Sequence, residues 1–229
     1  MKVSPDHPFK LIYSLFQHEY LGYLFESFVV QLDEKSRLTY SNQNISSQNA
    51  AEFDAGLDEN DYELIKLMDS MQQKEVLKHF QKRKGKPEDF FLKVYDKNSG
   101  DKLIQDEVEG YLERRRSKIL SLIDGKLLFE MGKDGEPTWK PIEISETRAT
   151  VLFHFRRNED NTHYFPTIKL DGEKVDFYQN DSYLLCKQPA WIVVNNKLFT
   201  FQKEVDGRKL KPFFNKKFIL IPGNVEETY

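Results

Sequence analysis

Four Asp-Gly dipeptides constrain the fold of this 229-residue chain more than any other feature of its sequence. All of them lie in the second half of the chain: Asp124-Gly125, Asp134-Gly135, Asp171-Gly172 and Asp206-Gly207. Asp-Gly favours the positive φ angles of tight hairpin turns. We therefore expect the chain from about residue 126 onward to consist of short strands joined by tight connections.

The segments between these dipeptides have the patterns of strands. Within Ala149–Arg157, apolar residues at every second position alternate with Leu152, His154 and Arg156, which is typical of a strand with one face toward solvent. Lys209–Asn215 is long enough for one or two helical turns. Six further short strands are predicted at Thr167–Leu170, Lys174–Phe177, Ser182–Cys186, Ala190–Val194, Lys197–Phe201 and Phe218–Ile221.

Helical spacing of apolar residues dominates the first half of the chain. It predicts helices over Pro8–Tyr20, from the acidic start Asp58–Asp61, from Pro87–Asp89 and over Asp101–Ile123,. Phe25–Leu32 and Arg37–Ser41 are predicted to form one β-hairpin. The fold class is therefore expected to be α+β: a mainly helical domain over residues 1–125 with one β-hairpin, followed by a β-rich, antiparallel domain over residues 126–229.

Charge and hydropathy exclude several classes of protein. The 34 Lys and Arg against 37 Asp and Glu leave a net charge of −3, so no global basic field attracts nucleic acid. The longest apolar run is Ala190–Val194, far below the roughly 20 residues of a membrane-spanning helix. The N-terminus lacks the features of a secretory signal, and a lone cysteine, Cys186, fits a reducing compartment,. A cytoplasmic chain without a membrane partner is expected.

Motifs for catalysis and cofactor binding are not found in the sequence. The phosphate-binding pattern Gly-x4-Gly-Lys-Ser/Thr does not occur, so this chain alone is not expected to hydrolyse ATP through such a loop. Among the five histidines, His154 and His163 form the one pair worth naming as zinc ligands, and an exposed pair without metal is the ordinary outcome,. Cys186 lies in an apolar strand and is expected to be buried and unreactive. We expect no catalytic, cofactor or metal site here.

Three clusters of basic residues remain as candidate binding sites. The first is Lys82–Lys84 with Lys86, and the second is Arg114–Arg116 with Lys118, part of which Glu109 and Glu113 can pair,. The third is interleaved with phenylalanines and is joined by two arginines: Lys203, Arg208, Lys209, Lys211, Lys216, Lys217, Arg156 and Arg157.

Such cations neutralise phosphates, and nearby aromatic rings can stack on exposed bases. The third cluster therefore predicts weak contact with the backbone of duplex DNA. Base discrimination is not expected, since no helix carries an Arg, Asn or Gln set suited to the major groove. The alternative is a solvated surface whose phenylalanines belong to the core, because they alternate along the chain as core residues do.

Several longer stretches carry a family resemblance. In the second half they are Gly132–Pro137, Val151–Arg157, Tyr164–Lys169, Gln188–Trp191 and Leu210–Phe213, and near the start they are Pro8–Tyr13 and Tyr20–Phe25. Together they resemble the N-terminal region of the Swi/Snf-type helicase-like ATPases of Bacteroidetes. In that family the region precedes a motor that couples ATP hydrolysis to translocation on duplex DNA. The resemblance implies a truncated chain whose motor, with its ATP and Mg²⁺, lies downstream.

The resemblance and the basic cluster together suggest a role. We expect a non-catalytic accessory region of a DNA-dependent ATPase that helps the motor engage DNA or a protein partner. A regulatory protein-interaction module that restrains the motor is an alternative, and a stand-alone enzyme of unknown chemistry is another. The basic, aromatic C-terminal segment favours contact with DNA, whereas the acidic N-terminal half favours contact with protein.

Overall fold

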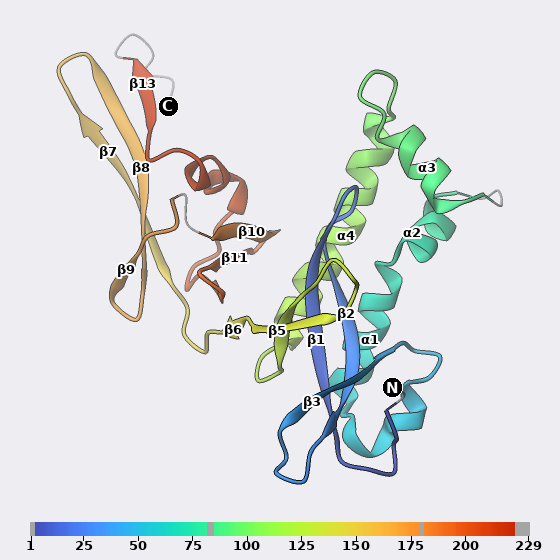
Figure 1. Ribbon diagram of the computed structural model, residues 1–229. Coiled ribbons are helices and arrows are strands. Elements are labelled where there is room, and N and C mark those ends of the chain that lie inside the picture. Colours follow the sequence, from blue (N-terminus) through green and yellow to red (C-terminus); the bar gives the residue numbers. More distant parts are fainter. Residues whose placement is uncertain (1–2, 82–84, 179–180, 223–229) are drawn as a thin grey trace. The chain divides into compact units, whose positions relative to one another are not determined.

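The computed structural model describes residues 3–81, 85–178 and 181–222, and the chain divides into two compact units (Figure 1). Unit 1 is Met1–Ile142 and unit 2 is Glu143–Tyr229. The division thus falls after Ile142, whereas the sequence suggested a boundary after Gly125. The difference arises because two strands that follow Gly125 pair within the sheet of unit 1 rather than with the strands of unit 2.

Unit 1 is built on a five-stranded mixed sheet with the order β3-β2-β1-β4-β5. The pairs β1–β2, β2–β3 and β4–β5 are antiparallel, whereas β1 and β4 are parallel. A parallel pair needs a long crossover, and here the helices between β3 and β4 supply it. The strands are β1 (Phe9–His18), β2 (Gly22–Leu32), β3 (Leu38–Ile45), β4 (Leu128–Met131) and β5 (Pro137–Pro141).

The helices of unit 1 begin where the sequence predicts for three of them. The Asp58 side chain accepts a hydrogen bond from the Asp61 backbone N–H, and the Asp61 side chain accepts one from the Asp58 backbone N–H. The Asp101 side chain accepts from the backbone N–H of Ile104. These caps satisfy N–H groups that the first turn leaves without partners. The helices are η1 (Ala50–Gly56), α1 (Glu59–Ser70), α2 (Gln73–Phe80), α3 (Pro87–Val94) and α4 (Lys102–Leu122).

The predicted helix over Pro8–Tyr20 is wrong, because this segment is strand β1. The strand is buried on both faces. Tyr13 faces α1 and donates its hydroxyl proton to Asp61 at 2.6 Å, whereas Ile12 joins Phe28 and Phe129 in an apolar cluster on the opposite face. A strand covered on both sides carries a continuous apolar run, and such a run has no period that separates it from a helix. The α+β class holds, but unit 1 combines a sheet with helices.

Unit 2 consists of two small sheets. One has the order β10-β11-β12-β6, with β6 parallel to β12, and the other has the order β13-β8-β7, with β9 paired to β8. The remaining pairs in these sheets are antiparallel. The elements are β6 (Glu143–Ile144), β7 (Thr150–Arg157), β8 (Asn161–Leu170), β9 (Glu173–Val175), β10 (Ser182–Lys187), β11 (Ala190–Val194), β12 (Lys197–Thr200), η2 (Gly207–Lys209), η3 (Lys211–Phe214) and β13 (Ile219–Pro222).

The four Asp-Gly dipeptides divide between two roles. Asp171-Gly172, with φ of 54° and 83°, forms the β8–β9 turn, and Asp134-Gly135 lies in the β4–β5 turn. The other two lie at helix ends: Gly125, with φ of 70°, follows α4, and Asp206 caps η2 by accepting from the Arg208 N–H. The hairpin prediction therefore holds at two of the four positions, because a short Asp side chain also bonds to backbone N–H groups that open a helix.

The core of unit 2 contains most of the phenylalanines that alternate with its basic residues. Phe199, Phe201, Phe213 and Phe214 are all buried in one cluster between the sheets and the 3-10 turns. Cys186 is also buried, as expected. Across the described residues, none of the helices is both long enough and apolar enough to span a membrane.

Candidate nucleic-acid interface

All eight basic residues of the candidate interface lie in unit 2, and all are exposed. Arg156 and Arg157 end strand β7, and Lys203 follows β12. Arg208 and Lys209 lie on η2 and Lys211 begins η3, whereas Lys216 and Lys217 precede β13. We call these eight residues the basic surface: Arg156, Arg157, Lys203, Arg208, Lys209, Lys211, Lys216 and Lys217.

The strand register brings one part of the basic surface together. Arg156 pairs with His163 across β7 and β8, and His163 pairs with Leu220 across β8 and β13. The ring of Phe218 stacks on the ring of His163, with centroids 4.1 Å apart and planes at 9°. Lys217 immediately precedes Phe218. Arg156 and Phe218, some sixty positions apart in the sequence, therefore both lie beside His163, whereas the Lys217 Nζ lies 5.3 Å from the centroid of the Tyr178 ring.

The cations on η2 and η3 form a second group beside β10. Arg208 is engaged in this group, because its guanidinium donates to both carboxylate oxygens of Asp206, at 2.7 Å from Nη2 and 3.0 Å from Nε. These bonds lower the pKa of Asp206 below its usual value. Arg208 and Asp206 thus offset each other's charge, whereas Lys209 and Lys211 are exposed cations.

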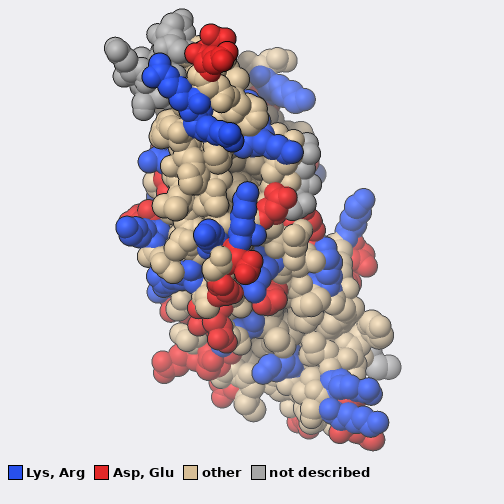
Figure 2. Space-filling model, turned by 90° about the vertical axis from the view of Figure 1, so that its left-hand side faces the viewer, with Lys and Arg blue, Asp and Glu red and all other residues tan. Residues whose placement is uncertain are grey.

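Acidic residues interrupt the positive charge of this region. Glu159 and Asp160 occupy the β7–β8 turn beside Arg157, and Glu204 follows Lys203. Figure 2 shows Lys and Arg side chains spread among uncharged ones over the upper part of the face in view, with Asp and Glu more frequent lower down. Such a surface suits weak, sequence-independent contact with phosphates more than tight binding.

The second basic cluster serves the fold of unit 1. The Arg116 side chain is 4% exposed and contacts Glu113 at 2.7 Å. It also donates to the carbonyl oxygens of Leu21 and Tyr23, at 3.0 Å each. The Arg115 guanidinium lies over the Tyr111 ring, 3.3 Å from its centroid. The Arg115 Nε also donates to the Ser70 hydroxyl at 2.8 Å. These contacts tie α4 to the β1–β2 hairpin and to the end of α1, so the buried Arg116 is not accessible to a ligand. Lys82–Lys84 lie outside the described residues.

The two named histidines each stack on an aromatic ring. His154 stacks on Phe165 with centroids 5.1 Å apart, and His163 stacks on Phe218. No group of three or more His, Cys, Asp or Glu suited to a metal ion occurs among the described residues. The stacking of Phe218 on His163 was not predicted from the sequence. It follows from the pairing of β13 with β8.

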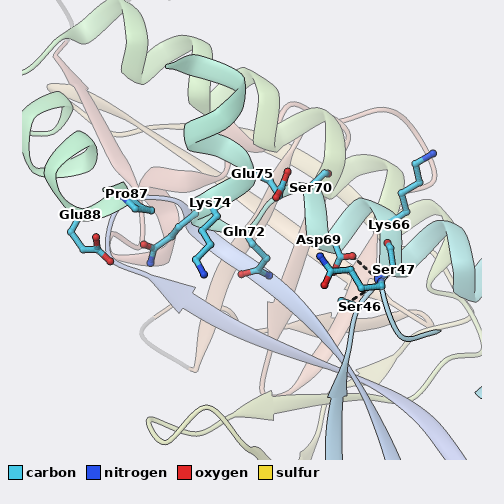
Figure 3. Close-up of a pocket in the computed structure, with 12 residues that line it drawn as sticks. Ser46, Ser47, Lys66, Asp69, Ser70, Gln72, Lys74, Glu75, Pro87 and Glu88 are labelled. Carbon is cyan, nitrogen blue, oxygen red and sulfur yellow. Dashed lines mark hydrogen bonds between the residues drawn. The ribbon is translucent and has the colours of Figure 1, made fainter. Parts of the chain in front are cut away.

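A polar cavity of about 690 Å³ lies in unit 1, between the start of α2 and the segment after β3. Figure 3 shows Gln72 and Lys74 projecting on the same side of the chain, and Asp69 beside Ser47. Asp69 accepts a hydrogen bond from the Ser47 backbone N–H at 2.7 Å. Lys66 and Lys74 stand among three carboxylates, those of Asp69, Glu75 and Glu88. The mixed signs select no ligand class, so we assign no function to this cavity.

Comparisons with models of protein families, with curated proteins and with solved structures found no significant match for this chain. The resemblance to Swi/Snf-type ATPases therefore rests on the sequence stretches named above.

Proposed function

We propose that this chain is a non-catalytic accessory region of a Swi/Snf-type DNA-dependent ATPase, and that unit 2 contacts the backbone of duplex DNA. ATP and Mg²⁺ belong in this proposal to a motor downstream of the chain. The observation that carries the proposal is that all eight residues of the basic surface are exposed on unit 2, whereas Arg115 and Arg116 of α4 are engaged within unit 1. The buried lone Cys186 supports a cytoplasmic location,.

The expected binding is weak and independent of sequence. Each neutralised phosphate adds roughly −0.9 to the slope of log K against log salt. If about three cations of the basic surface contact phosphate at once, the slope is near −3 and the dissociation constant is roughly 10⁻⁴–10⁻⁶ M. Base preference is expected to be absent, because no recognition helix accompanies the basic surface.

A charge-reversal experiment tests the proposal. Lys209, Lys211 and Lys216 are changed together to Glu, which leaves the Arg208–Asp206 pair in place. The matched control changes three exposed lysines of unit 1, Lys35, Lys93 and Lys97, and so alters the net charge equally. Fluorescence anisotropy with a short duplex is expected to show affinity falling at least tenfold in the first variant and less than threefold in the control.

Two outcomes contradict the proposal. Equal losses in the two variants mean that net charge, and not the basic surface, governs binding. An absence of binding even at low salt favours the alternative, a protein-interaction module that contacts the motor.

A further inference from the structure

The sheet β13-β8-β7 gathers apolar side chains at its surface. Half of the eight exposed large hydrophobic side chains among the described residues lie on this sheet or directly beside it. They are Leu152, Phe155, Phe218 and Leu220. Exposed apolar side chains that cluster in this way mark an interaction site more often than isolated ones do.

Strand register places most of these groups on one face. Side chains at alternate positions share a face, and those of Val151, Phe153 and Ile168 pack on the core. The opposite face, which we call the outer face, holds residues from all three strands and Phe218 just before β13: Leu152, His154, Arg156, His163, Phe218 and Leu220. Phe165 pairs with His154 across the strands, and its side chain also packs against the core.

Flat rings are already ordered on the outer face. His154 lies on Phe165 with planes at 25°, and Phe218 lies on His163 with planes at 9°. Phe218 is 41% exposed, so its ring is accessible while His163 holds it in place. A ring fixed in this way loses little conformational entropy when a second flat group stacks on it.

Cations border these rings. Arg156 pairs with His163 across the strands, and Lys216 precedes Phe218 by two positions, whereas the Lys217 Nζ lies 5.3 Å from the centroid of the Tyr178 ring. The length of β7 from Leu152 to Arg156 is roughly 13 Å, at about 3.3 Å per residue. This length can accommodate a few nucleotides. The combination of a stacking ring with flanking cations is complementary to a strand of unpaired bases and phosphates.

We propose that the outer face binds single-stranded nucleic acid, with an unpaired base stacked on Phe218 and phosphates contacted by Arg156 and Lys216. Open sheet faces that carry aromatic side chains stack bases in this manner. Base pairs in a duplex hide their faces from such a ring, so Phe218 distinguishes unpaired strands from paired ones. The inference rests on the proposed function, because both use the cations of the basic surface. It adds that the strand bound at the outer face is unpaired.

The test uses the full chain with three labelled ligands: a twelve-nucleotide oligo-dT, an oligo-U of the same length and a blunt-ended duplex. Phe218→Leu keeps an apolar side chain but removes the flat ring, and Phe218→Trp restores one.

Stacking on an aromatic ring strengthens binding on the order of fivefold or more per base. Phe218→Leu is therefore expected to weaken binding of both single strands at least fivefold and binding of duplex less than twofold, whereas Phe218→Trp keeps wild-type affinity. Tyr40→Leu, which removes an 86% exposed ring in unit 1, is the control and is expected to change neither.

The outcomes separate this inference from the proposed function. Unchanged oligo-dT and oligo-U affinity in Phe218→Leu overturns the inference, and the proposed function still stands if the lysine reversals weaken duplex binding. A loss confined to oligo-U assigns the face to RNA, and equal losses assign it to either strand, so both support the inference. If the wild type binds no oligonucleotide and self-associates through Leu152 and Leu220, the outer face is a protein-docking surface and both proposals fail.

Discussion

The basic clusters of α4 in unit 1 and of η2 and η3 in unit 2 lie in different surroundings. In unit 1, Arg116 is enclosed by backbone carbonyls and Glu113, and Lys126 bridges two aspartates. In unit 2, Lys209 and Lys211 lie on short 3-10 turns at the surface. Both regions are clusters of basic residues in the sequence. The difference teaches that the role of such a cluster depends on which residues the fold places around it.

The Lys126 network shows how unit 1 binds its charges. Lys126 Nζ lies 2.7 Å from a carboxylate oxygen of Asp58 and 2.7 Å from one of Asp61, and Asp61 also accepts the hydroxyl of Tyr13. Burial alone lowers the pKa of Lys126, but hydrogen bonds to the two aspartates outweigh it, so the pKa is raised. The network joins the start of α1, the centre of β1 and the turn before β4.

The largest effect is expected for Arg116→Met. Loss of this side chain removes the donor to the carbonyls of Leu21 and Tyr23 and the cation that contacts the carboxylate of Glu113. We expect the free energy of unfolding to fall by about 3 kcal/mol, measured by urea denaturation. Arg114→Met removes an exposed neighbour and is expected to cost less than about 0.5 kcal/mol. Similar losses in both variants would contradict the internal role of Arg116.

A smaller effect is expected for Tyr13→Phe, which removes the hydrogen bond to Asp61. The expected loss is about 2 kcal/mol near neutral pH, since the acceptor is charged and buried,. Urea denaturation at pH 8 measures it. A loss below about 0.5 kcal/mol would show that this bond does not hold α1 on the sheet.

The same residue predicts a dependence on pH. Burial first, and then Asp61, raises the pKa of Tyr13 above its ordinary value. A raised folded-state pKa gives stability that is full below the unfolded value, about 10, and is lost as pH rises above it. Wild-type stability is therefore expected to fall progressively as pH rises above about 10, and Tyr13→Phe to flatten this fall. Parallel pH profiles for the two proteins would contradict the assignment.

The smallest change in stability is expected for Asp206→Ala in unit 2. This substitution removes the cap of η2 at an exposed site, and we expect a loss below about 1 kcal/mol. It also frees the Arg208 guanidinium from Asp206, so duplex affinity is expected to rise about twofold to threefold, as each additional cation adds to phosphate attraction. Anisotropy titration measures the gain. Weaker binding would mean that the Arg208–Asp206 pair itself forms the contact.

Much of unit 2 could be predicted from its sequence, because its strands are short, alternate in polarity and are separated by turn residues such as Asp171-Gly172. Helix α4 could be predicted from its cap, Asp101. Strand β1 could not, since burial on both faces removes the alternation that marks a strand. Helix α2 was missed because it is eight residues long and buries only Val76 and Leu77.

The candidate site could be predicted only in part. The sequence identifies the exposed lysines as cations. It does not show that they differ from the arginines of α4, because that difference lies in burial, which a run of basic residues does not reveal. The stack of Phe218 on His163 joins residues more than fifty positions apart. It arises from the pairing of β13 with β8, and the four-residue strand β13 offers too short a pattern to fix its partner.

The central claim is that unit 2, and not unit 1, presents the cations that meet nucleic acid, and a lysine footprint tests it most directly. An amine-reactive label is applied to the full chain with and without a short duplex, and mass spectrometry compares each lysine within one sample. The account predicts that duplex reduces labelling of Lys209, Lys211 and Lys216 while labelling of Lys35, Lys93 and Lys97 stays unchanged. Equal protection of both sets, or protection confined to the lysines of unit 1, would contradict it.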